Sequence, residues 1–463
     1  MEMTLREISE AVGGKLPAAG DLDKKIGRVS IDSRDIGPGD FFVPLAGEHT
    51  DGHRFIAAAA EKGAAGCFAA FSKNVTHPEG MTVISVEDPE QALQDLSAFY
   101  RRKFQLPVVA VTGSVGKTTT KDMIAAALSP ELKTLKTEGN LNNHLGVPLM
   151  LTRLDSTYEA AVLEMGMSGY GEIDLLAKLA LPTVAVITNI GESHLEMLGS
   201  REGIARAKCE LLGHLAADGV AVVNADEPLL VPHIKGLGCR VITFGFDEHA
   251  TVRCTDIIND EAGKRAIIEQ EGFAPLEVVP PLPGRHNIYN LMAALAVGRL
   301  LGVDDSVLTE GFSRVRLSGM RLETVTTPAG IQVINDAYNA SPTAVSAAFD
   351  VLAELAKDAA RFAVLGDMLE LGDWEEEGHR QTGRQVARHN LSGLLVLGER
   401  AQLIADGAVA AGYPPQRVYR CESHAQAAQV IAKIARAGDW VLLKGSRGMR
   451  MEDVLAVLLE GKK

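Results

Sequence analysis

The sequence has few cysteines, few aromatic residues and no long apolar run. No stretch approaches the roughly 20 apolar residues needed to span a bilayer. The N-terminal residues 1–16 carry charges throughout and lack the apolar core of a signal peptide. The cysteines are scattered and form no C-x-x-C pair, so we expect reduced thiols: Cys67, Cys209, Cys239, Cys254 and Cys421. These absences predict a cytoplasmic protein without membrane insertion.

Positive charge is also in short supply. The chain has 46 Lys and Arg against 60 Asp and Glu, a formal net charge of −14. Such a surface repels nucleic acid and anionic membrane, so we expect neither as a partner. A phosphorylated ligand must therefore be held locally by lysines, arginines, backbone amides or a metal ion.

Short apolar segments that alternate with helical ones are abundant. A length of 463 residues suggests about three domains, and we predict an α/β fold with domains at residues 1–85, 86–311 and 312–463. The first is a small α/β unit, and the second alternates apolar strands and helices in the way that is typical of a parallel sheet covered on both faces. The third is another open α/β sheet. Ligands of such sheets bind beyond the carboxyl ends of the strands.

A candidate phosphate-binding loop follows one of these strands, in "PVVAVTGSVGKTTTKDMI" at residues 107–124. The long consensus G-x-x-x-x-G-K-[ST] asks for glycine where this chain has Val111. The strand, the glycine turn and the helix start nevertheless predict a nucleotide site, because amides and the helix dipole converge there on an anion. Lys117 would contact the β- and γ-phosphates, and Thr118 would bind Mg²⁺. The alternative is an ordinary turn with a solvated lysine.

Three further polar residues lie in the same block. Glu164 ends the strand of "EAAVLEM", His194 follows the strand of "TVAVITN", and Lys208 lies on the helix of "REGIARAKCELL". Each has a simpler interpretation, as a turn cap, a surface loop residue and a helix-face cation, respectively. Taken together near a phosphate loop, Glu164 and His194 suggest ligands for a divalent ion that bridges ATP and an acceptor.

These motifs in this order resemble the ATP-dependent Mur ligase family, which makes amide bonds in peptidoglycan-precursor synthesis. The resemblance covers essentially the whole chain and rests on "TGSVGKTTTK", "EGNLNNHLGVPL", "EMGMSGYGEI", "ITNIGESHLEMLGSREGIARAKCEL" and "GRHNIYNLMAALA". The family uses the shorter loop T-G-x-x-G-K-[ST], so Val111 is no departure. "DSRDIGPGDFFVPLAGEHTDGHRFI" is similar to the UDP-binding domain of two members, those that add the third residue and the terminal dipeptide. The member that adds D-alanyl-D-alanine is singled out by its similarity to "NDAYNASPTA", "AVLGDMLELG" with His379 downstream, and "LLKGSRGMRMEDV".

The resemblance implies a ligase that forms carbon–nitrogen bonds. ATP would phosphorylate the carboxylate of UDP-N-acetylmuramoyl-tripeptide, and D-alanyl-D-alanine would attack the acyl phosphate to give the pentapeptide precursor. It also implies an N-terminal UDP-substrate domain, a central ATP-binding P-loop domain and a C-terminal Rossmann-like domain that binds D-alanyl-D-alanine and part of ATP. We expect a monomer whose domains close on binding.

The resemblance also assigns residues. The catalytic set is Lys117, Glu164, His194 and Lys208, and the metal ligands are Thr118, Glu164, His194 and Lys208. Lys208 matches a lysine that the family carboxylates with CO₂, and an unmodified lysine is the alternative. ATP contacts match Gly113, Ser114, Val115, Gly116, Lys117, Thr118, Thr119, Asn287, Asn290, Arg321 and Asp336. Substrate contacts match Ser33 and Arg34 at the uridine end, Asn142 and Asn143 near the acceptor carboxylate, and Tyr338, Asn339, Lys444 and Arg447 for the dipeptide.

Other interpretations remain at this point. The nearest are the family member that adds the third peptide residue and a polyglutamylating relative. A P-loop NTPase used as a switch is a rival of a different class, and it predicts ATP turnover that is independent of any UDP-substrate. A kinase is a weaker rival because the third block would then have no task.

Overall fold

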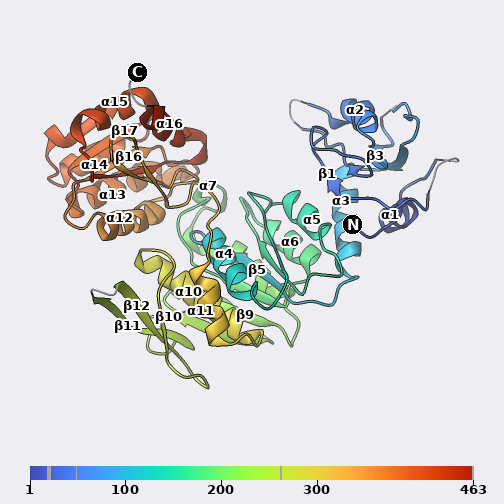
Figure 1. Cartoon of the computed structure of the whole chain (residues 1–463), viewed down its shortest axis with the longest axis horizontal. Helices are drawn as coiled ribbons and strands as arrows, with labels where there is room; N and C mark the ends of the chain where they lie inside the picture. The colour runs from blue at the N-terminus through green and yellow to red at the C-terminus, as the bar shows by residue number, and fades with distance from the viewer. Residues whose placement is uncertain (18–21, 48–49, 74, 261–262, 461–463) are drawn as a thin grey trace.

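The computed structural model describes residues 1–17, 22–47, 50–73, 75–260 and 263–460. Within these residues the strands form three separate sheets, one for each block of the chain. Figure 1 shows the N-terminal unit (blue) and the C-terminal unit (red) on opposite sides above the central unit. Parallel sheets covered by helices confirm the predicted α/β class. No helix in the described part of the chain has both the length and the apolar character needed to cross a membrane.

The N-terminal sheet has the order β1-β2-β3-β4, and all its neighbouring strands are parallel. Helix α3 follows it, capped by the Asp88 side chain and started by Pro89, a residue suited to the first helical turn. The elements are β1 (Val29–Ser30), β2 (Phe41–Phe42), β3 (Gly66–Ala70), β4 (Thr82–Val86), α1 (Leu5–Val12), η1 (Gly52–Phe55), α2 (Ile56–Glu61) and α3 (Pro89–Arg101).

Helix α3 joins this unit to the central one. It packs against α1 on one side and against α5 and α6 on the other. Its buried Tyr100 accepts a hydrogen bond from the Glu2 amide and donates one to the Leu154 carbonyl (2.8 Å). A single hydrophobic core therefore runs from Met3 through α3 to the central strands.

The central sheet has the order β13-β12-β11-β10-β9-β8-β5-β7-β6. Its strands are β5 (Val108–Thr112), β6 (Thr134–Lys136), β7 (Ala160–Glu164), β8 (Val184–Ile187), β9 (Val220–Asn224), β10 (Arg240–Gly245), β11 (Val252–Asp260), β12 (Gly263–Gln270) and β13 (Leu276–Val278). Its helices are α4 (Lys117–Leu128), α5 (Gly146–Leu151), α6 (Glu172–Ala180), α7 (Leu195–Leu198), α8 (Arg201–Cys209), η2 (Glu210–His214), η3 (Pro228–Leu230), α9 (Val231–Ile234), α10 (Arg285–Leu300) and α11 (Asp305–Ser313).

Strand β5 lies at the switch point of this sheet. Every residue of β5 is buried, because helices cover both faces of the sheet. The chain leaves β5 toward β6 and β7 and later continues on the other side with β8. A crevice forms at the carboxyl ends of strands where the order reverses in this way, and ligands bind there.

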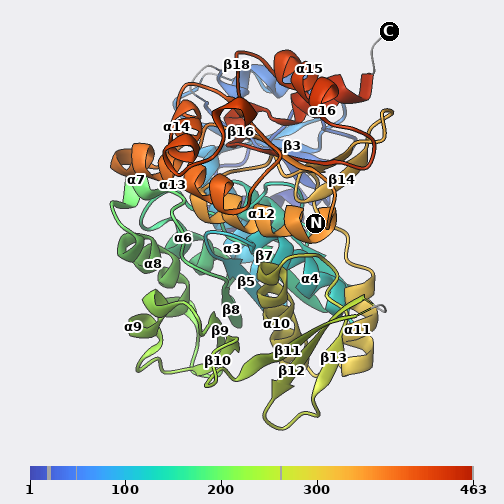
Figure 2. The ribbon, with the colours of Figure 1, turned by 90° about the vertical axis from the view of Figure 1, so that its left-hand side faces the viewer.

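One edge of the central sheet differs from the sequence-based expectation of a parallel sheet. Strands β11, β12 and β13 pair antiparallel. The connections between them are too short to hold a crossover helix, and only antiparallel strands can be joined in this way. Figure 2 shows this edge extending away from the other units.

The C-terminal sheet has the order β14-β15-β19-β16-β17-β18, parallel except for the edge strand β14. Helices α12, α13 and α14 cover one face, and α15 and α16 cover the other. The elements are β14 (Glu323–Thr326), β15 (Gln332–Asn335), β16 (Arg361–Gly366), β17 (Gly393–Leu397), β18 (Val418–Cys421), β19 (Trp440–Lys444), α12 (Pro342–Ala356), η4 (Gly372–Trp374), α13 (Glu375–Arg388), α14 (Gln402–Ala410), η5 (Pro415–Arg417), α15 (His424–Ile434), η6 (Arg447–Met449) and α16 (Glu452–Glu460).

Candidate active site

A cleft of about 360 Å³ is lined by residues that follow the carboxyl ends of central strands and of C-terminal strands. Its volume is within the usual range for small-molecule sites. Many sequence-predicted residues line it together: Ser114, Val115, Gly116, Lys117, Thr119, Asn142, Asn143, Glu164, His194, Asn290, Arg321, Asp336, Tyr338, Asn339 and Lys444. Both domains therefore contribute to one site.

The phosphate loop connects β5 to α4 through two glycines with positive φ, Gly113 (+146°) and Gly116 (+85°). A Cβ at Gly113 would lie 1.9 Å from the Thr188 hydroxyl oxygen, and one at Gly116 (φ +85°) would lie 2.6 Å from the Asn290 side chain. The loop can approach its neighbours this closely only because both positions are glycine. The backbone that could cradle an anion is thereby held in place.

Not all amides of this loop are available to a phosphate. The Ser114 amide donates to the Asn189 carbonyl (3.0 Å), and the Val115 amide donates to the Asn189 side chain (2.9 Å). The first amides of α4, from Lys117 to Thr119, are the orphan donors of a helix start. In the part of the chain that the structure describes, these helix amides have no hydrogen-bond partner, so they, rather than the whole loop, can donate to an anion.

Lys117 folds back over its own loop. Its ammonium donates to the Gly113 carbonyl oxygen (2.9 Å). Burial lowers the pKa of Lys117 from its usual 10.5; the Glu164 carboxylate opposes that shift, and the Arg321 guanidinium adds to it. A ligand with several negative charges would relieve this repulsion, so the cleft is electrostatically prepared for an anion.

Glu164, at the end of β7, is buried and held by neutral donors. The Thr118 hydroxyl donates to its Oε2 (2.6 Å), and the Asn142 amide donates to its Oε1 (2.8 Å). None of the described residues forms an ion pair with this carboxylate. A buried negative charge without a cation is costly, so Glu164 and Thr118 together suit a bound cation.

His194 follows β8 and lines the same cleft. Its backbone is left-handed (φ +66°), and its Nδ1 lies 2.6 Å from a carboxylate oxygen of Glu370 in the C-terminal domain. Sequence reasoning identified His194 but not Glu370, which comes from a loop about 180 residues further along the chain.

Lys208 lies on α8 behind the cleft wall, with 1 % of its surface exposed. Burial holds its pKa well below the usual 10.5, and the charge of Lys117 lowers the pKa further. Within the described residues no acceptor contacts its amine. A lysine in this setting favours the neutral form, which is the nucleophilic one.

Predicted nucleotide ligands Asn287 and Asn290 form a relay along α10. Asn290 donates to the Asn287 side chain (3.0 Å) and accepts from the Thr120 hydroxyl on α4 (3.0 Å). Asn287 in turn donates to the Pro283 carbonyl (2.6 Å). Asn290 lines the cleft, whereas Asn287 is buried directly behind it. The relay fixes α10 against the phosphate-loop helix.

The C-terminal wall of the cleft carries paired charges. Lys444, at the end of β19, forms an ion pair with Asp336, which follows β15, and donates to the Asn339 carbonyl (2.9 Å). The Arg321 guanidinium stacks over the Tyr338 ring at 4.0 Å. These residues were predicted separately for ATP and for the dipeptide, and the structure places them side by side.

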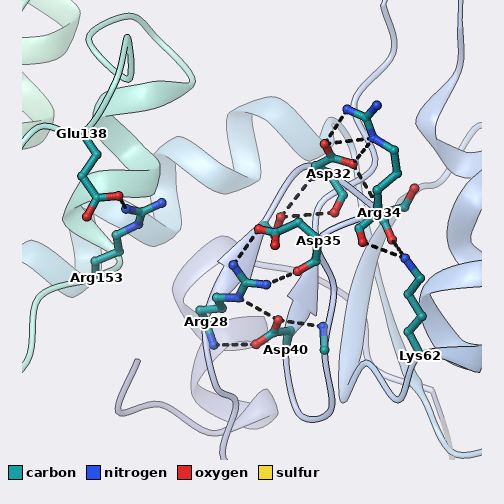
Figure 3. Close-up of polar contacts among 11 residues, drawn as sticks. Arg28, Asp32, Arg34, Asp35, Asp40, Lys62, Glu138 and Arg153 are labelled. Atoms are coloured by element: carbon teal, nitrogen blue, oxygen red, sulfur yellow. Dashed lines mark hydrogen bonds and ion pairs between the residues drawn. The ribbon is translucent and has the colours of Figure 1, made fainter. Parts of the chain in front are cut away.

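Three predicted substrate residues lie outside the cleft lining. Arg447 forms an ion pair with Glu452 (2.6 Å). Ser33 and Arg34 lie in the N-terminal domain, where the Lys62 ammonium donates to both of their carbonyls (2.9 and 2.8 Å). Figure 3 shows this loop, with the Arg34 guanidinium turned back on Asp32. That pairing lowers the pKa of Asp32 to about 2.

Sequence reasoning missed His286, which lines the cleft between the two domains. Its Nδ1 is buried without a hydrogen-bond partner among the described residues, and burial lowers its pKa to about 4. The sequence did contain a signal that could have identified His286, because this residue precedes Asn287 in the motif "GRHN" at the start of a helix. Ser193, Glu172 and Ser341 also line the cleft and had no such signal.

Comparison with protein families gives three matches in chain order. Residues 25–101 match the Mur ligase family catalytic domain, residues 111–298 match the Mur ligase middle domain, and residues 320–447 match the Mur ligase glutamate ligase domain.

Named relatives match almost the whole length of the chain. The chain is 40% identical over 461 residues to the UDP-N-acetylmuramoyl-tripeptide–D-alanyl-D-alanine ligase of Bacillus subtilis, covering 99% of both chains. It is 32% identical to the enzyme of that name from Escherichia coli, again covering 99% of both.

Solved structures show the same likeness. MurF from Acinetobacter baumannii is 31% identical, with a TM-score of 0.88 and 99% of both chains covered. MurF ligase from Thermotoga maritima in complex with ADP is 29% identical, with a TM-score of 0.81, 94% of this chain and 97% of that chain covered.

Proposed function

Because this chain belongs to the Mur ligase family, we propose that it joins D-alanyl-D-alanine to UDP-N-acetylmuramoyl-tripeptide with ATP as the energy source. The observation that carries this function is the shared cleft, in which the phosphate loop with Lys117 and Glu164 faces the charged C-terminal wall. A phosphate donor and a second substrate can therefore meet at one place.

The reaction has two steps. The tripeptide carboxylate attacks the γ-phosphorus, so that a carboxyl oxygen–phosphorus bond forms and ADP leaves. The amine of D-alanyl-D-alanine then attacks the acyl carbon, loses a proton, and the carbon–oxygen bond to phosphate breaks to give the amide and inorganic phosphate. The first step is needed because a carboxylate is a poor electrophile and phosphorylation supplies a leaving group.

Lys117 and the first amides of α4 hold the triphosphate. Among the described residues the Lys117 ammonium donates only to carbonyls of its own loop, and a triphosphate would draw it toward the β- and γ-phosphates. Asn142, which donates to Glu164, and Asn143 line the same cleft and would contact the acceptor carboxylate. Asn290, Arg321 and the Asp336 carboxylate complete the nucleotide side.

The residues fit a divalent ion. Thr118 and Glu164 offer the hard oxygen ligands that Mg²⁺ prefers, and His194 adds a nitrogen. No cluster of three or more His, Cys, Asp or Glu side chains suited to a metal occurs in the described part of the chain, so substrate phosphates would have to complete the coordination of the ion. When bound, Mg²⁺ would neutralise charge on the transferring phosphoryl group.

Lys208 completes this arrangement as a carbamate. Its buried amine favours the neutral form, and a neutral amine adds CO₂ with loss of a proton. The product would be an anionic group in place of the neutral amine, and the positive charge of Lys117 would favour such a group as its neighbour. Lys208 would thereby supply an oxygen ligand for the ion.

The dipeptide is assigned to the C-terminal wall. Tyr338, Asn339 and Lys444 lie there, and a lysine suits the carboxylate of D-alanyl-D-alanine. Arg447 would join them after releasing Glu452. The uridine end of the other substrate is assigned to the loop of Ser33 and Arg34 in the N-terminal domain. Since ATP and UDP-linked precursors are cytoplasmic metabolites and one chain forms the whole cleft, we infer a cytoplasmic monomer.

Phosphate release and product formation test this function. The full-length protein with ATP, Mg²⁺ and UDP-N-acetylmuramoyl-tripeptide should release one phosphate for each pentapeptide, and only when D-alanyl-D-alanine is present. A Glu164→Gln variant is the matched control and should lose the turnover. Release with the third-residue amino acid and the dipeptide precursor would favour the rival ligase, and release without any UDP-substrate would favour an NTPase switch.

A further inference from the structure

The C-terminal domain contacts the candidate metal ligand His194 through the loop that follows β16. Glu370 of this loop places its Oε2 2.6 Å from the His194 Nδ1, and its carbonyl accepts from the Glu196 amide (3.2 Å). Gly372 packs directly on the same segment, because a Cβ there would lie 2.8 Å from the Glu196 Cα. The two loops therefore meet backbone to backbone.

Both residues of the pair have uncommon backbone conformations. His194 (φ +66°) and Glu370 (φ +65°) are left-handed although neither is glycine. Such conformations persist only where the surrounding structure enforces them. The two side chains of these residues meet across the domain boundary.

Buried groups hold the Glu370 loop. The Met368 amide donates to the His379 Nε2 (3.0 Å), and the Leu369 amide donates to the Ser446 hydroxyl (2.9 Å). His379 is fully buried, and its Nδ1 donates to the Glu375 carbonyl (2.7 Å). The carboxylate of Glu370 is thus presented from a fixed loop.

The half-exposed carboxylate contacts the imidazole from outside the cleft lining. His194 lines the cleft, whereas Glu370 does not. A carboxylate that accepts from Nδ1–H fixes the tautomer in which Nε2 keeps its lone pair. The ring nitrogen that remains for a ligand is therefore the one not covered by Glu370.

We propose that Glu370 is a positioning residue, which orients His194 and fixes its tautomer from the C-terminal domain, so that His194 becomes a metal ligand only when this domain is docked. The inference rests on the proposed function, which assigns a divalent ion to the cleft. It makes domain docking a condition for the complete ion site.

The competing explanation is that the contact between Glu370 and His194 only holds the two domains together and has no effect on the metal ligand. The chain offers a matched contact to separate the two, because the Thr343 hydroxyl donates to the Glu192 Oε2 (2.6 Å) across the same interface without touching His194. Thr343→Val removes one interdomain hydrogen bond and leaves the imidazole alone.

The test measures Mn²⁺ binding to the full-length protein with a non-hydrolysable ATP analogue, by electron paramagnetic resonance of free Mn²⁺. Glu370→Ala should weaken binding about tenfold, as is usual for a lost outer partner of a metal-bound histidine. Glu370→Gln, whose amide oxygen still accepts from Nδ1, should restore most of it, and Thr343→Val should match the wild type. Glu370→Ala should add nothing to His194→Ala.

Equal Mn²⁺ affinity of Glu370→Ala and the wild type would overturn the inference, as would equal losses in Glu370→Ala and Thr343→Val. A tighter Mn²⁺ complex of Glu370→Ala would also overturn it, because Glu370 would then compete with the ion. These results leave the proposed ligase intact. A wild-type protein that binds no Mn²⁺ with the ATP analogue would instead refute the metal-dependent function itself.

Discussion

Asp122 on the phosphate-loop helix α4 should be among the most sensitive charged positions for stability. Its carboxylate is buried and receives the Lys121 ammonium (2.9 Å) and the Lys136 ammonium (2.8 Å). It also accepts from the Ser318 amide (3.1 Å) and hydroxyl (3.0 Å) in the segment that leads to the C-terminal domain. The positive charge of Lys121 lowers the pKa of Asp122 against the effect of burial.

Asp122→Ala removes the partner of a buried cation. The Lys121 side chain is 1% exposed and, among the described residues, would keep only the Thr137 carbonyl (2.9 Å) as a partner. Removing one member of a buried ion pair costs about 3–5 kcal/mol, because the remaining charge stays desolvated. The Ser318 contacts are part of the same network and are not added separately. We therefore expect a loss of about 4 kcal/mol in the free energy of unfolding.

Urea titrations with two probes locate this loss. Both tryptophans, Trp374 and Trp440, lie in the C-terminal domain, so fluorescence reports that domain and circular dichroism reports all three. With an m-value of about 2 kcal/mol/M, the change should lower the dichroism midpoint by roughly 2 M and the fluorescence midpoint by less.

The matched control is Glu138→Ala, which breaks an exposed pair with Arg153 in the same domain. Exposed pairs contribute about 0–1 kcal/mol, so the midpoint should shift by less than about 0.5 M. Equal shifts for Asp122→Ala and Glu138→Ala would refute the reasoning that burial determines the cost.

Four other outcomes are expected. Lys117→Met should lower kcat for ligation at least ~100-fold in a phosphate-release assay, because the transferring phosphoryl group loses its cation; near-normal kcat would contradict that role. Lys208→Ala should be inactive and partly rescued by a short carboxylic acid, and failure of rescue would leave the carbamate unsupported. Burial lowers the pKa of His379, so the unfolded chain takes up the proton first and the free energy of unfolding should fall as pH drops below about 6.5. In urea titrations followed by fluorescence, the free energy of unfolding should change less between pH 7.5 and pH 5.5 in His379→Gln than in the wild type. ATP with the UDP-substrate should reduce the radius of gyration in small-angle scattering, and unchanged dimensions would argue against domain closure.

The central half of the site could be predicted from local sequence. A strand, two glycines and a helix start suffice to place Lys117 and Thr118, since the geometry is set within about ten residues. Glu164 and His194 could be placed near them because the carboxyl ends of parallel strands meet at one edge. The α/β class followed from the same alternation and is confirmed.

Contacts between distant segments could not be predicted. The pairing of Asp336 with Lys444 depends on β15 lying beside β19, which sequence order does not reveal. The contact of His194 with Glu370 depends on how two domains dock. Competition for the backbone amides of the loop is equally hidden, since the carbonyl and the side chain of Asn189 accept from two amides that the motif would assign to phosphate.

The continuous core around α3 has a consequence for substrate choice. Tyr100 and its neighbours fasten the N-terminal domain to the central sheet, so these two units cannot slide relative to each other without breaking that core. The span from the loop of Ser33 to Glu164 is then a fixed length. For a substrate anchored at its nucleotide end, only a peptide stem whose length matches this fixed span would bring its terminal carboxylate to the phosphates.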